Sequence, residues 1–206
     1  MDISQKENGN VSEELQHFRV FSINRDICRS RYRDSIVITD NTLCSGWLDV
    51  GSRDQCTRDS VVATACLRII GGTVTTIEKY PPTAAVLLIG YFSTNQICGG
   101  SIINQRHILT AAHCFTFTLN AGVYLIRVGS SMAHSGGTTH HIDRIILHPQ
   151  WNTRTVDNDV AIMRTTTAIT YGITVQPANL AESTYRLLDN DSVWAVGWGL
   201  TSVSTT

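Results

Sequence analysis

Three short stretches of the chain carry side chains whose types together could catalyse acyl transfer. They are an imidazole, a carboxylate and a hydroxyl: His113 in the stretch LTAAHC, Asp159 in DNDVA and Ser60 in DQCTRDS. An imidazole exchanges protons near neutral pH, a carboxylate can fix its tautomer, and a hydroxyl that loses its proton can attack a carbonyl carbon. A fold that brings the three together would have the groups that covalent hydrolysis of a peptide bond requires.

The sequence around these residues resembles that of the chymotrypsin-like (S1) serine proteases. LTAAHC is similar to the histidine motif of that family, DNDVA to its aspartate motif, and RIIGG at 68–72 to its activation cleavage site. The stretches 152–159 and 39–47 are most similar to the digestive trypsins of moths and butterflies. Because several separate motifs match, chance similarity is a poor explanation.

The resemblance gives each of these residues a role. His113 would be the general base and acid, Asp159 would orient it from the buried side, and Ser60 would be the nucleophile. Asp54 would lie at the base of the primary specificity pocket and pair with an Arg or Lys of a protein or peptide substrate. The implied activity is a trypsin-like endopeptidase that cleaves after Arg or Lys, needs no cofactor and is bound by protein protease inhibitors.

The resemblance also implies a zymogen. Cleavage after Arg68 would free the amino group of Ile69, and in the family such a new terminus pairs with the aspartate just before the nucleophile. That aspartate is Asp59 in this chain. Activation of the site is therefore expected to depend on cleavage between residues 68 and 69.

The stretch after Cys56 departs from the family's pattern. The family has Gly-Asp-Ser-Gly-Gly-Pro where this chain has RDSVVA at 58–63. The glycine replaced by Arg58 contributes a backbone N–H to the oxyanion hole, where loss of one donor costs about 10²–10³-fold in rate. The two valines add β-branched bulk where glycine lets the backbone turn tightly. We therefore expect little or no turnover from this chain.

The matching segments define the domain organisation, and their order is unusual. Residues 1–60 resemble the later part of the family's second barrel up to the catalytic serine region, 61–68 resemble an activation-peptide-like link, and 69–206 resemble the first barrel plus the start of the second. The family's sequence would run from Trp198 onward into a stretch like the one at Ser12, so the end of the chain is expected to meet its beginning. This order indicates a circular permutation or a splice of two neighbouring protease genes, and the last quarter of the family's domain has no counterpart.

Short apolar or β-branched runs separated by turn-forming residues predict an all-β fold. The clearest runs are 18–23, 84–89, 124–128, 142–147 and 193–197, and helical turns are predicted only near 111–115 and after residue 24. The resemblance narrows this class to a chymotrypsin-like double β-barrel whose second barrel is incomplete and permuted.

Composition argues against several other partners. The net charge of −1 over 206 residues gives no electrostatic reason to expect nucleic acid or an anionic membrane surface. No apolar run approaches the roughly 20 residues of a membrane span. His140 and His141 would point to opposite faces of a strand, so we expect no metal site there or elsewhere. All of the 16 basic residues except Lys6 and Lys79 are arginines, which suits an alkaline fluid or reflects lineage bias.

Six cysteines indicate disulfides and an oxidising compartment. The resemblance implies two pairs, Cys98–Cys114 and Cys28–Cys44. Cys56 and Cys66 remain, either bridged to each other or as free thiols. The family and the disulfides imply an extracellular location, whereas the start of the chain, MDISQKEN, has no apolar signal region.

The sequence leaves three interpretations of function open. The first is a trypsin-like serine endopeptidase. The second is a catalytically inactive homologue that binds protein ligands through the cleft that holds the substrate in active members of the family. The third is a chimeric gene model that joins parts of two adjacent trypsin genes.

Overall fold

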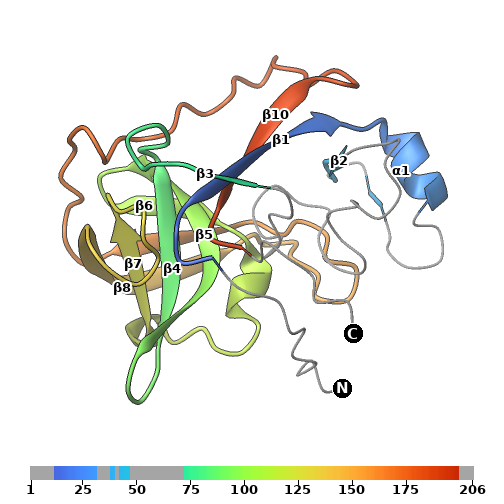
Figure 1. Ribbon diagram of the computed structural model, residues 1–206. Coiled ribbons are helices and arrows are strands. Elements are labelled where there is room, and N and C mark those ends of the chain that lie inside the picture. Colours follow the sequence, from blue (N-terminus) through green and yellow to red (C-terminus); the bar gives the residue numbers. More distant parts are fainter. Residues whose placement is uncertain (1–11, 32–37, 40–41, 47–71, 200–206) are drawn as a thin grey trace, which may run out of the picture.

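The computed structural model describes residues 12–31, 38–39, 42–46 and 72–199, which form a mostly β structure (Figure 1). Its elements, in chain order, are β1 (Gln16–Ser22), α1 (Arg25–Arg31), β2 (Ser45–Gly46), β3 (Thr73–Val74), β4 (Thr83–Ile89), β5 (Thr94–Asn104), β6 (His107–Thr110), the 3-10 helices η1 (Ala112–Phe115) and η2 (Ala121–Val123), β7 (Tyr124–Val128), β8 (Thr138–Leu147), β9 (Ala161–Thr165) and β10 (Ser192–Gly197). The predicted all-β class is confirmed. Within the described ranges, no helix is long and apolar enough to cross a lipid bilayer.

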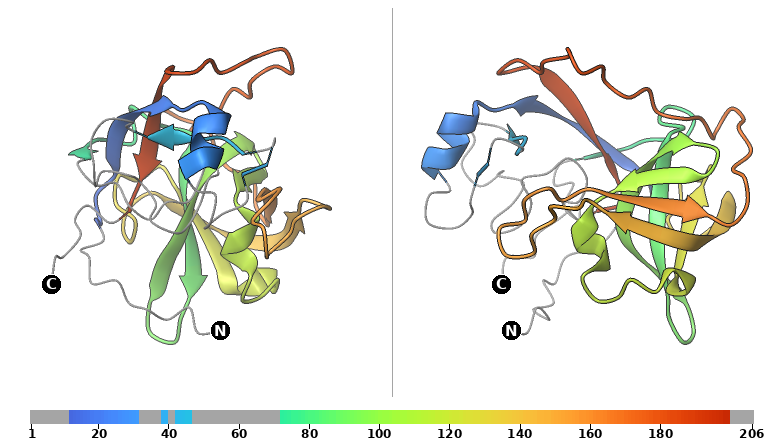
Figure 2. Two further views of the ribbon diagram at one scale, coloured as in Figure 1. Left: turned by 90° about the vertical axis from the view of Figure 1, so that its right-hand side faces the viewer. Right: turned by 180° about the vertical axis from the view of Figure 1, so that it is seen from behind.

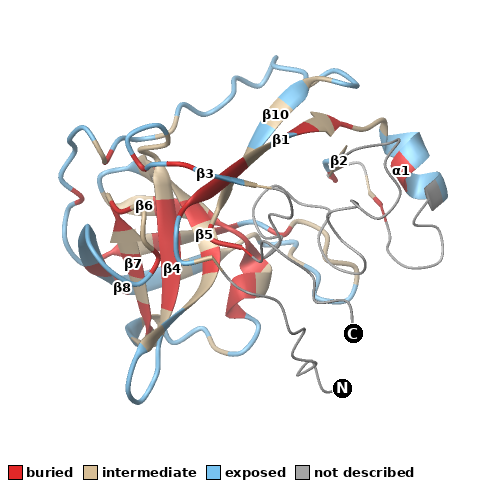
Figure 3. Ribbon diagram, viewed as in Figure 1, coloured by how far each residue is buried: buried red, intermediate tan, exposed pale blue. Residues whose placement is uncertain are grey.

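Six strands close into a barrel in the order β4-β5-β6-β9-β8-β7, and each neighbouring pair is antiparallel. Alternation of side chains along the strands fills the interior. In β7, Tyr124, Ile126 and Val128 are buried, whereas Leu125 and Arg127 between them are only partly buried. Figure 3 shows buried positions along the barrel strands and also along β1 of the second sheet. This closed barrel is the part of the molecule on which the site is built.

A close approach of two barrel strands explains one glycine in β5. A Cβ atom on Gly100 would lie 2.7 Å from Ile108 Cγ2 and 2.9 Å from the carbonyl oxygen of Leu109, both in β6. The neighbouring Gly99 would meet only the carbonyl oxygen of Ala84, at 4.0 Å. Gly100 is therefore required by the packing of β5 on β6. The strand β6 leads directly into η1, which carries His113.

The second sheet is assembled from both ends of the described chain. It has the order β10-β1-β2, with β3 also pairing with β1. β1 and β10 are antiparallel from the pair Gln16–Gly197 to the pair Phe21–Ser192, and the two strands lie side by side in each view of Figure 2. The backbone N–H of Ser12 donates to the carbonyl oxygen of Gly199 at 3.2 Å. Among the described residues this sheet is open, with β10 at one edge.

A small apolar cluster joins the second sheet to the barrel. Leu15 before β1 and Trp198 after β10 are fully buried against Leu87 of the barrel strand β4. Both also bond to the same acceptor, because the backbone N–H of Leu15 and the indole N–H of Trp198 donate to the carbonyl oxygen of Ser131 at 2.7 and 2.8 Å. The two ends of the described chain are thus fixed, through Leu15 and Trp198, to one point beside the barrel.

Most of the predicted strands are present. The run 124–128 is β7, and the runs 18–23, 84–89, 142–147 and 193–197 overlap β1, β4, β8 and β10. The predicted turns correspond to η1 and to α1. The longest strand, β5, was not predicted, because its sequence TNQICGGSIIN has polar residues and a glycine pair in place of an apolar run.

Candidate active site

His113 and Asp159 lie next to the ends of two neighbouring barrel strands. His113 lies in η1, directly after β6, and Asp159 lies just before β9. β6 and β9 are antiparallel and pair Thr110 with Ala161, so the end of one strand lies beside the start of the other. This pairing brings together two residues that are 46 positions apart in the sequence.

The two side chains are in direct contact. His113 Nδ1 lies 2.6 Å from Asp159 Oδ2, and the backbone N–H of His113 donates to Asp159 Oδ1 at 2.7 Å. The Asp159 side chain is fully buried, whereas one third of the His113 side chain is exposed. An ionised carboxylate only accepts hydrogen bonds, so Nδ1 carries the proton and Nε2 keeps a free lone pair. The arrangement is that of an oriented proton acceptor.

The loop that carries Asp159 is held in an uncommon backbone conformation. Asn158 and the β-branched Val156 both have φ of 56°, in the left-handed region. A residue of this kind costs on the order of 1–3 kcal/mol unless its surroundings enforce it. One contact that holds this loop comes from the N-terminal part of the chain, where Thr39 Oγ1 donates a hydrogen bond to Asp157 Oδ1 at 2.7 Å. The N-terminal segment therefore helps to position the loop next to His113.

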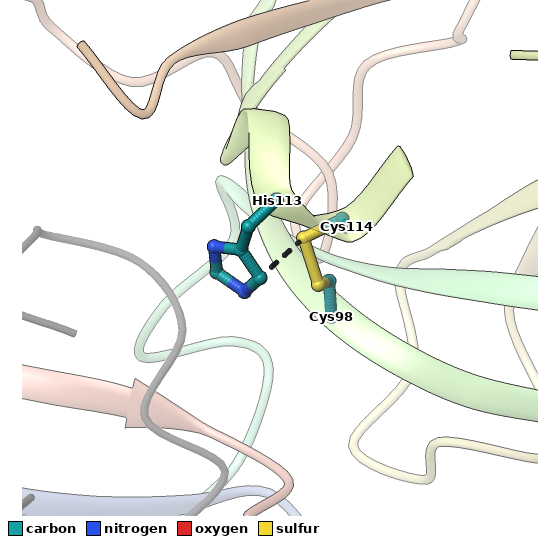
Figure 4. Close-up of side chains that lie close together, drawn as sticks. All are labelled: Cys98, His113 and Cys114. Atoms are coloured by element: carbon teal, nitrogen blue, oxygen red, sulfur yellow. Dashed lines mark hydrogen bonds between the residues drawn. A yellow bond between two sulfur atoms is a disulfide. The ribbon is translucent and has the colours of Figure 1, made fainter. Parts of the chain in front are cut away.

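Among the described residues, two disulfides are present, at the pairs that the resemblance implies. Cys98 in β5 is bonded to Cys114 in η1, and Cys28 in α1 is bonded to Cys44 next to β2. Figure 4 shows the His113 ring beside the first of these disulfides. Cys98, His113 and Cys114 offer donor atoms within 4.8 Å of one another, but sulfur atoms bonded to each other have no thiolate to give to a metal.

The other predicted site residues lie outside the described residues. These are Ser60, Asp54, Arg68 and Ile69, together with the aspartate at 59, the arginine at 58 and the cysteines at 56 and 66. The structure thus brings His113 and Asp159 together and leaves the nucleophile, the specificity pocket and the activation site as predictions.

Sequence reasoning missed a buried histidine at the second sheet that packs between two aromatic side chains. His17 in β1 stacks on Trp194 of β10 with ring centroids 4.8 Å apart, and its Nδ1 lies 2.5 Å from the Tyr80 hydroxyl. Burial, and next the positive charge of Lys79, lower the pKa of His17 below its usual value. No motif marks His17, because the contact joins segments that are distant in the sequence.

The closed barrel with a buried aspartate behind a part-exposed histidine defines the class of the protein, that of the chymotrypsin-like serine proteases. A family model described as Trypsin matches residues 69–205, and the chain belongs to that family.

Individual relatives agree with this assignment. Trypsin CFT-1 of Choristoneura fumiferana is 50% identical over 135 residues, which cover 65% of this chain and 52% of the relative. Trypsin, alkaline A of Manduca sexta is 48% identical over 138 residues (64% and 52%), and Achelase-1 of Lonomia achelous is 50% identical over 134 residues (65% and 61%). The chain thus spans about half the length of the curated relatives it matches. The predicted similarity to lepidopteran trypsins is confirmed.

A solved structure supports the fold. The crystal structure of the scabies mite inactivated protease paralogue S-D1 is 27% identical, has a TM-score of 0.50, and is matched over 57% of this chain and 48% of its own length. The chymotrypsin-like fold is therefore shown.

Proposed function

We propose that this chain is a serine endopeptidase of the trypsin type, which hydrolyses peptide bonds after Arg or Lys through an acyl-enzyme, with the low turnover expected from the RDSVVA sequence at 58–63. The observation that carries the proposal is the 2.6 Å contact between His113 Nδ1 and the fully buried Asp159 carboxylate. A surface histidine has no need of a buried carboxylate behind it, whereas a general base does, because the carboxylate fixes the tautomer and stabilises the imidazolium.

In the proposed mechanism, His113 Nε2 takes the proton of the nucleophile as the hydroxyl attacks the scissile carbonyl carbon. The imidazolium that forms is stabilised by Asp159, and it then gives the proton to the leaving amine. A water deprotonated by the same Nε2 hydrolyses the acyl-enzyme. Ser60 is the proposed nucleophile, on the strength of its spacing from Cys56.

Specificity and activation follow from the same match. Asp54 is the proposed partner of an Arg or Lys side chain at the substrate's cleaved residue, and cleavage after Arg68 is the proposed activation step. Protein or peptide substrates and protein protease inhibitors are the proposed partners. The Cys28–Cys44 and Cys98–Cys114 disulfides support an extracellular site of action.

A second candidate function is non-catalytic binding of proteins at the surface around His113. It is favoured by the RDSVVA sequence at 58–63, where the family has glycines around its nucleophile. The structural similarity to a protease paralogue described as inactivated also supports it. In this case His113 and Asp159 would be retained from a catalytic ancestor.

Labelling with a fluorophosphonate probe separates the two functions. The full chain is treated with the probe before and after limited digestion with trypsin, and the modified residue is located by mass spectrometry. The proposal predicts label on Ser60 only after cleavage between Arg68 and Ile69, with none on the Ser60→Ala or His113→Ala variants. Absence of label from a folded, cleaved chain would reject the endopeptidase and leave the binding function.

A further inference from the structure

A turn at the edge of the second sheet carries the sequence Asn-x-Ser. The residues are Asn190, Asp191 and Ser192, and Ser192 is the first residue of β10. Asn-x-Ser or Asn-x-Thr, with x other than proline, is the acceptor sequence for N-linked glycans in chains that pass through the secretory pathway. So short a pattern also occurs by chance, and the structural surroundings of the asparagine decide whether the site is usable.

This turn is at the surface. Asn190 and Ser192 are both exposed, and Figure 3 shows the segment that leads into β10 exposed along most of its length. The φ of Asn190 is 66°, a left-handed conformation that asparagine tolerates better than most residues. Its backbone N–H donates to the carbonyl oxygen of Ser22 at 2.9 Å, so the backbone of the turn is fixed to the end of β1.

The side-chain amide of Asn190 has no hydrogen-bond partner among the described residues. Other asparagines are bound into the fold by that group. Nδ2 of Asn24 donates to Asp189 at 2.6 Å, and Nδ2 of Asn158 donates to the carbonyl oxygen of Gln150 at 3.1 Å. A group attached to either of those nitrogens would break a bond, whereas one attached to Asn190 breaks none.

We propose that Asn190 is a site of N-linked glycosylation. The donor is a lipid-linked oligosaccharide, and the transferase of the secretory pathway recognises the Ser192 hydroxyl two residues after the acceptor. A bond forms between Asn190 Nδ2 and C1 of the first sugar, the bond from C1 to the lipid diphosphate breaks, and the amide loses one proton. The modified side chain stays neutral and carries a bulky hydrated group.

Passage through the secretory pathway is the condition for this modification. The Cys28–Cys44 and Cys98–Cys114 disulfides support that route, because disulfides form and persist in oxidising compartments. The modification does not depend on whether His113 and a nucleophile turn over a substrate. The glycan and the endopeptidase activity can therefore fail separately.

The place of the glycan gives it a use. Asn190 lies two residues before β10, which among the described residues is an edge strand. Ser192–Gly197 has no charge and no proline, and the Trp194 side chain is 53% exposed. Charges and prolines are the usual devices that stop such an edge from pairing with another chain. A hydrated glycan at the start of β10 would hinder that pairing.

Peptide mapping tests the modification directly. The full chain is directed into the secretory pathway of cultured insect cells by a cleavable leader, and the secreted protein is treated with peptide N-glycosidase in ¹⁸O water. Trypsin cleaves after Arg186, and no Lys or Arg follows, so Asn190 is the sole asparagine of the peptide 187–206. We expect this peptide to contain ¹⁸O-labelled aspartate at 190.

Two variants remove the glycan in different ways. Ser192→Ala destroys the acceptor sequence and leaves Asn190 in place, whereas Asn190→Gly removes the acceptor and suits the positive φ. Neither should carry a glycan on 187–206, and Ser192→Thr should keep it. The other acceptor sequence, at 10–12, is reported by the separate tryptic peptide 7–19.

A folded, secreted wild-type chain with no glycan on 187–206 would overturn the proposal, and glycan on 7–19 alone would overturn it equally. Sedimentation velocity then tests the protection of β10. We expect Ser192→Ala and the enzymatically deglycosylated chain to self-associate more than the glycosylated chain. Equal association would reject the protective role and leave the modification standing.

Discussion

The closed barrel and the open sheet are built from the same kind of strand, but they differ in how the chain supplies them. The barrel uses six strands that are consecutive between Thr83 and Thr165. The sheet takes β1 and β2 from the start of the chain and β10 from its end, and β2 and β3 are two residues long. Contacts between distant segments are formed at a greater loop-closure cost than local ones. The barrel is thus the self-supporting region, and it carries both residues of the assembled pair.

Substitution of the buried aspartate should have the largest effect. Asp159→Asn keeps the shape of the side chain but lets the His113 ring take the wrong tautomer. We expect the rate at which fluorophosphonate labels the cleaved chain to fall by about 10⁴-fold, the size established for this substitution in serine protease triads. Asp157→Asn, two residues away, is the matched control and should cost far less, because Asp157 contacts Thr39 and not His113. Equal losses would mean that the loop, and not the carboxylate, governs the site.

Truncation of a barrel core residue should have the next largest effect. Ile126 in β7 is fully buried in the main core, and Ile126→Ala should lower the free energy of unfolding by about 2–5 kcal/mol. Ile146→Ala on β8, where the side chain is 43% exposed, should stay within about 0.5 kcal/mol of the wild type. Urea denaturation measures both. A small loss at Ile126 would show that the barrel is not the stable region.

A pair of adjacent glycines tests the packing of β5 on β6. Gly100→Ala places a methyl group 2.7 Å from Ile108 Cγ2 and should cost about 1–3 kcal/mol of unfolding free energy. Gly99→Ala has room, so its cost should be near zero or slightly favourable. Thermal unfolding of the two variants gives the comparison, and equal midpoints would contradict the close approach of these strands.

Acid should weaken the molecule modestly through two buried histidines. Burial lowers the pKa of His17 in the open sheet, where Lys79 adds to the effect, and burial alone lowers the pKa of His140 in the barrel. The unfolded chain, with histidine pKa near 6.5, therefore binds more protons than the folded chain between that value and the folded pKa. Stability should rise with pH through this window and be lost as pH falls below about 6.5.

Denaturation at a series of pH values, with His17→Gln and His140→Gln compared, assigns the loss to the open sheet or to the barrel. Each substitution should flatten the pH dependence, while His134→Gln at an exposed loop should leave it unchanged. Stability that increases toward acid would contradict both assignments, and would also count against a protein adapted to alkaline fluid.

The same contrast between the regions separates what the sequence could predict from what it could not. Alternating runs such as Tyr124–Val128 predicted barrel strands directly, because one face of such a strand is buried. β5 was missed because polar residues and the pair Gly99–Gly100 interrupt its apolar pattern, and of the two glycines Gly100 is required by the packing of β5 on β6. The pairing of β1 with β10 has no periodic signal, and only the resemblance led us to expect that the chain's end meets its beginning.

The candidate site shows the same limit. The motifs around His113 and Asp159 pointed to both residues, but the cysteine sulfur near Nε2 and the contact of Thr39 with Asp157 depend on tertiary structure alone. Side chains that meet across distant segments leave no trace in local spacing.

The most direct test of the central claim is proton NMR of the imidazole N–H protons. The claim is that the barrel holds His113 Nδ1–H against the buried Asp159 carboxylate whether or not the chain turns over substrate. A short hydrogen bond of this kind moves its proton far downfield, so we predict one strongly downfield resonance that disappears in both His113→Ala and Asp159→Asn. A folded wild-type chain with no such resonance, or a resonance that survives either substitution, would contradict the account.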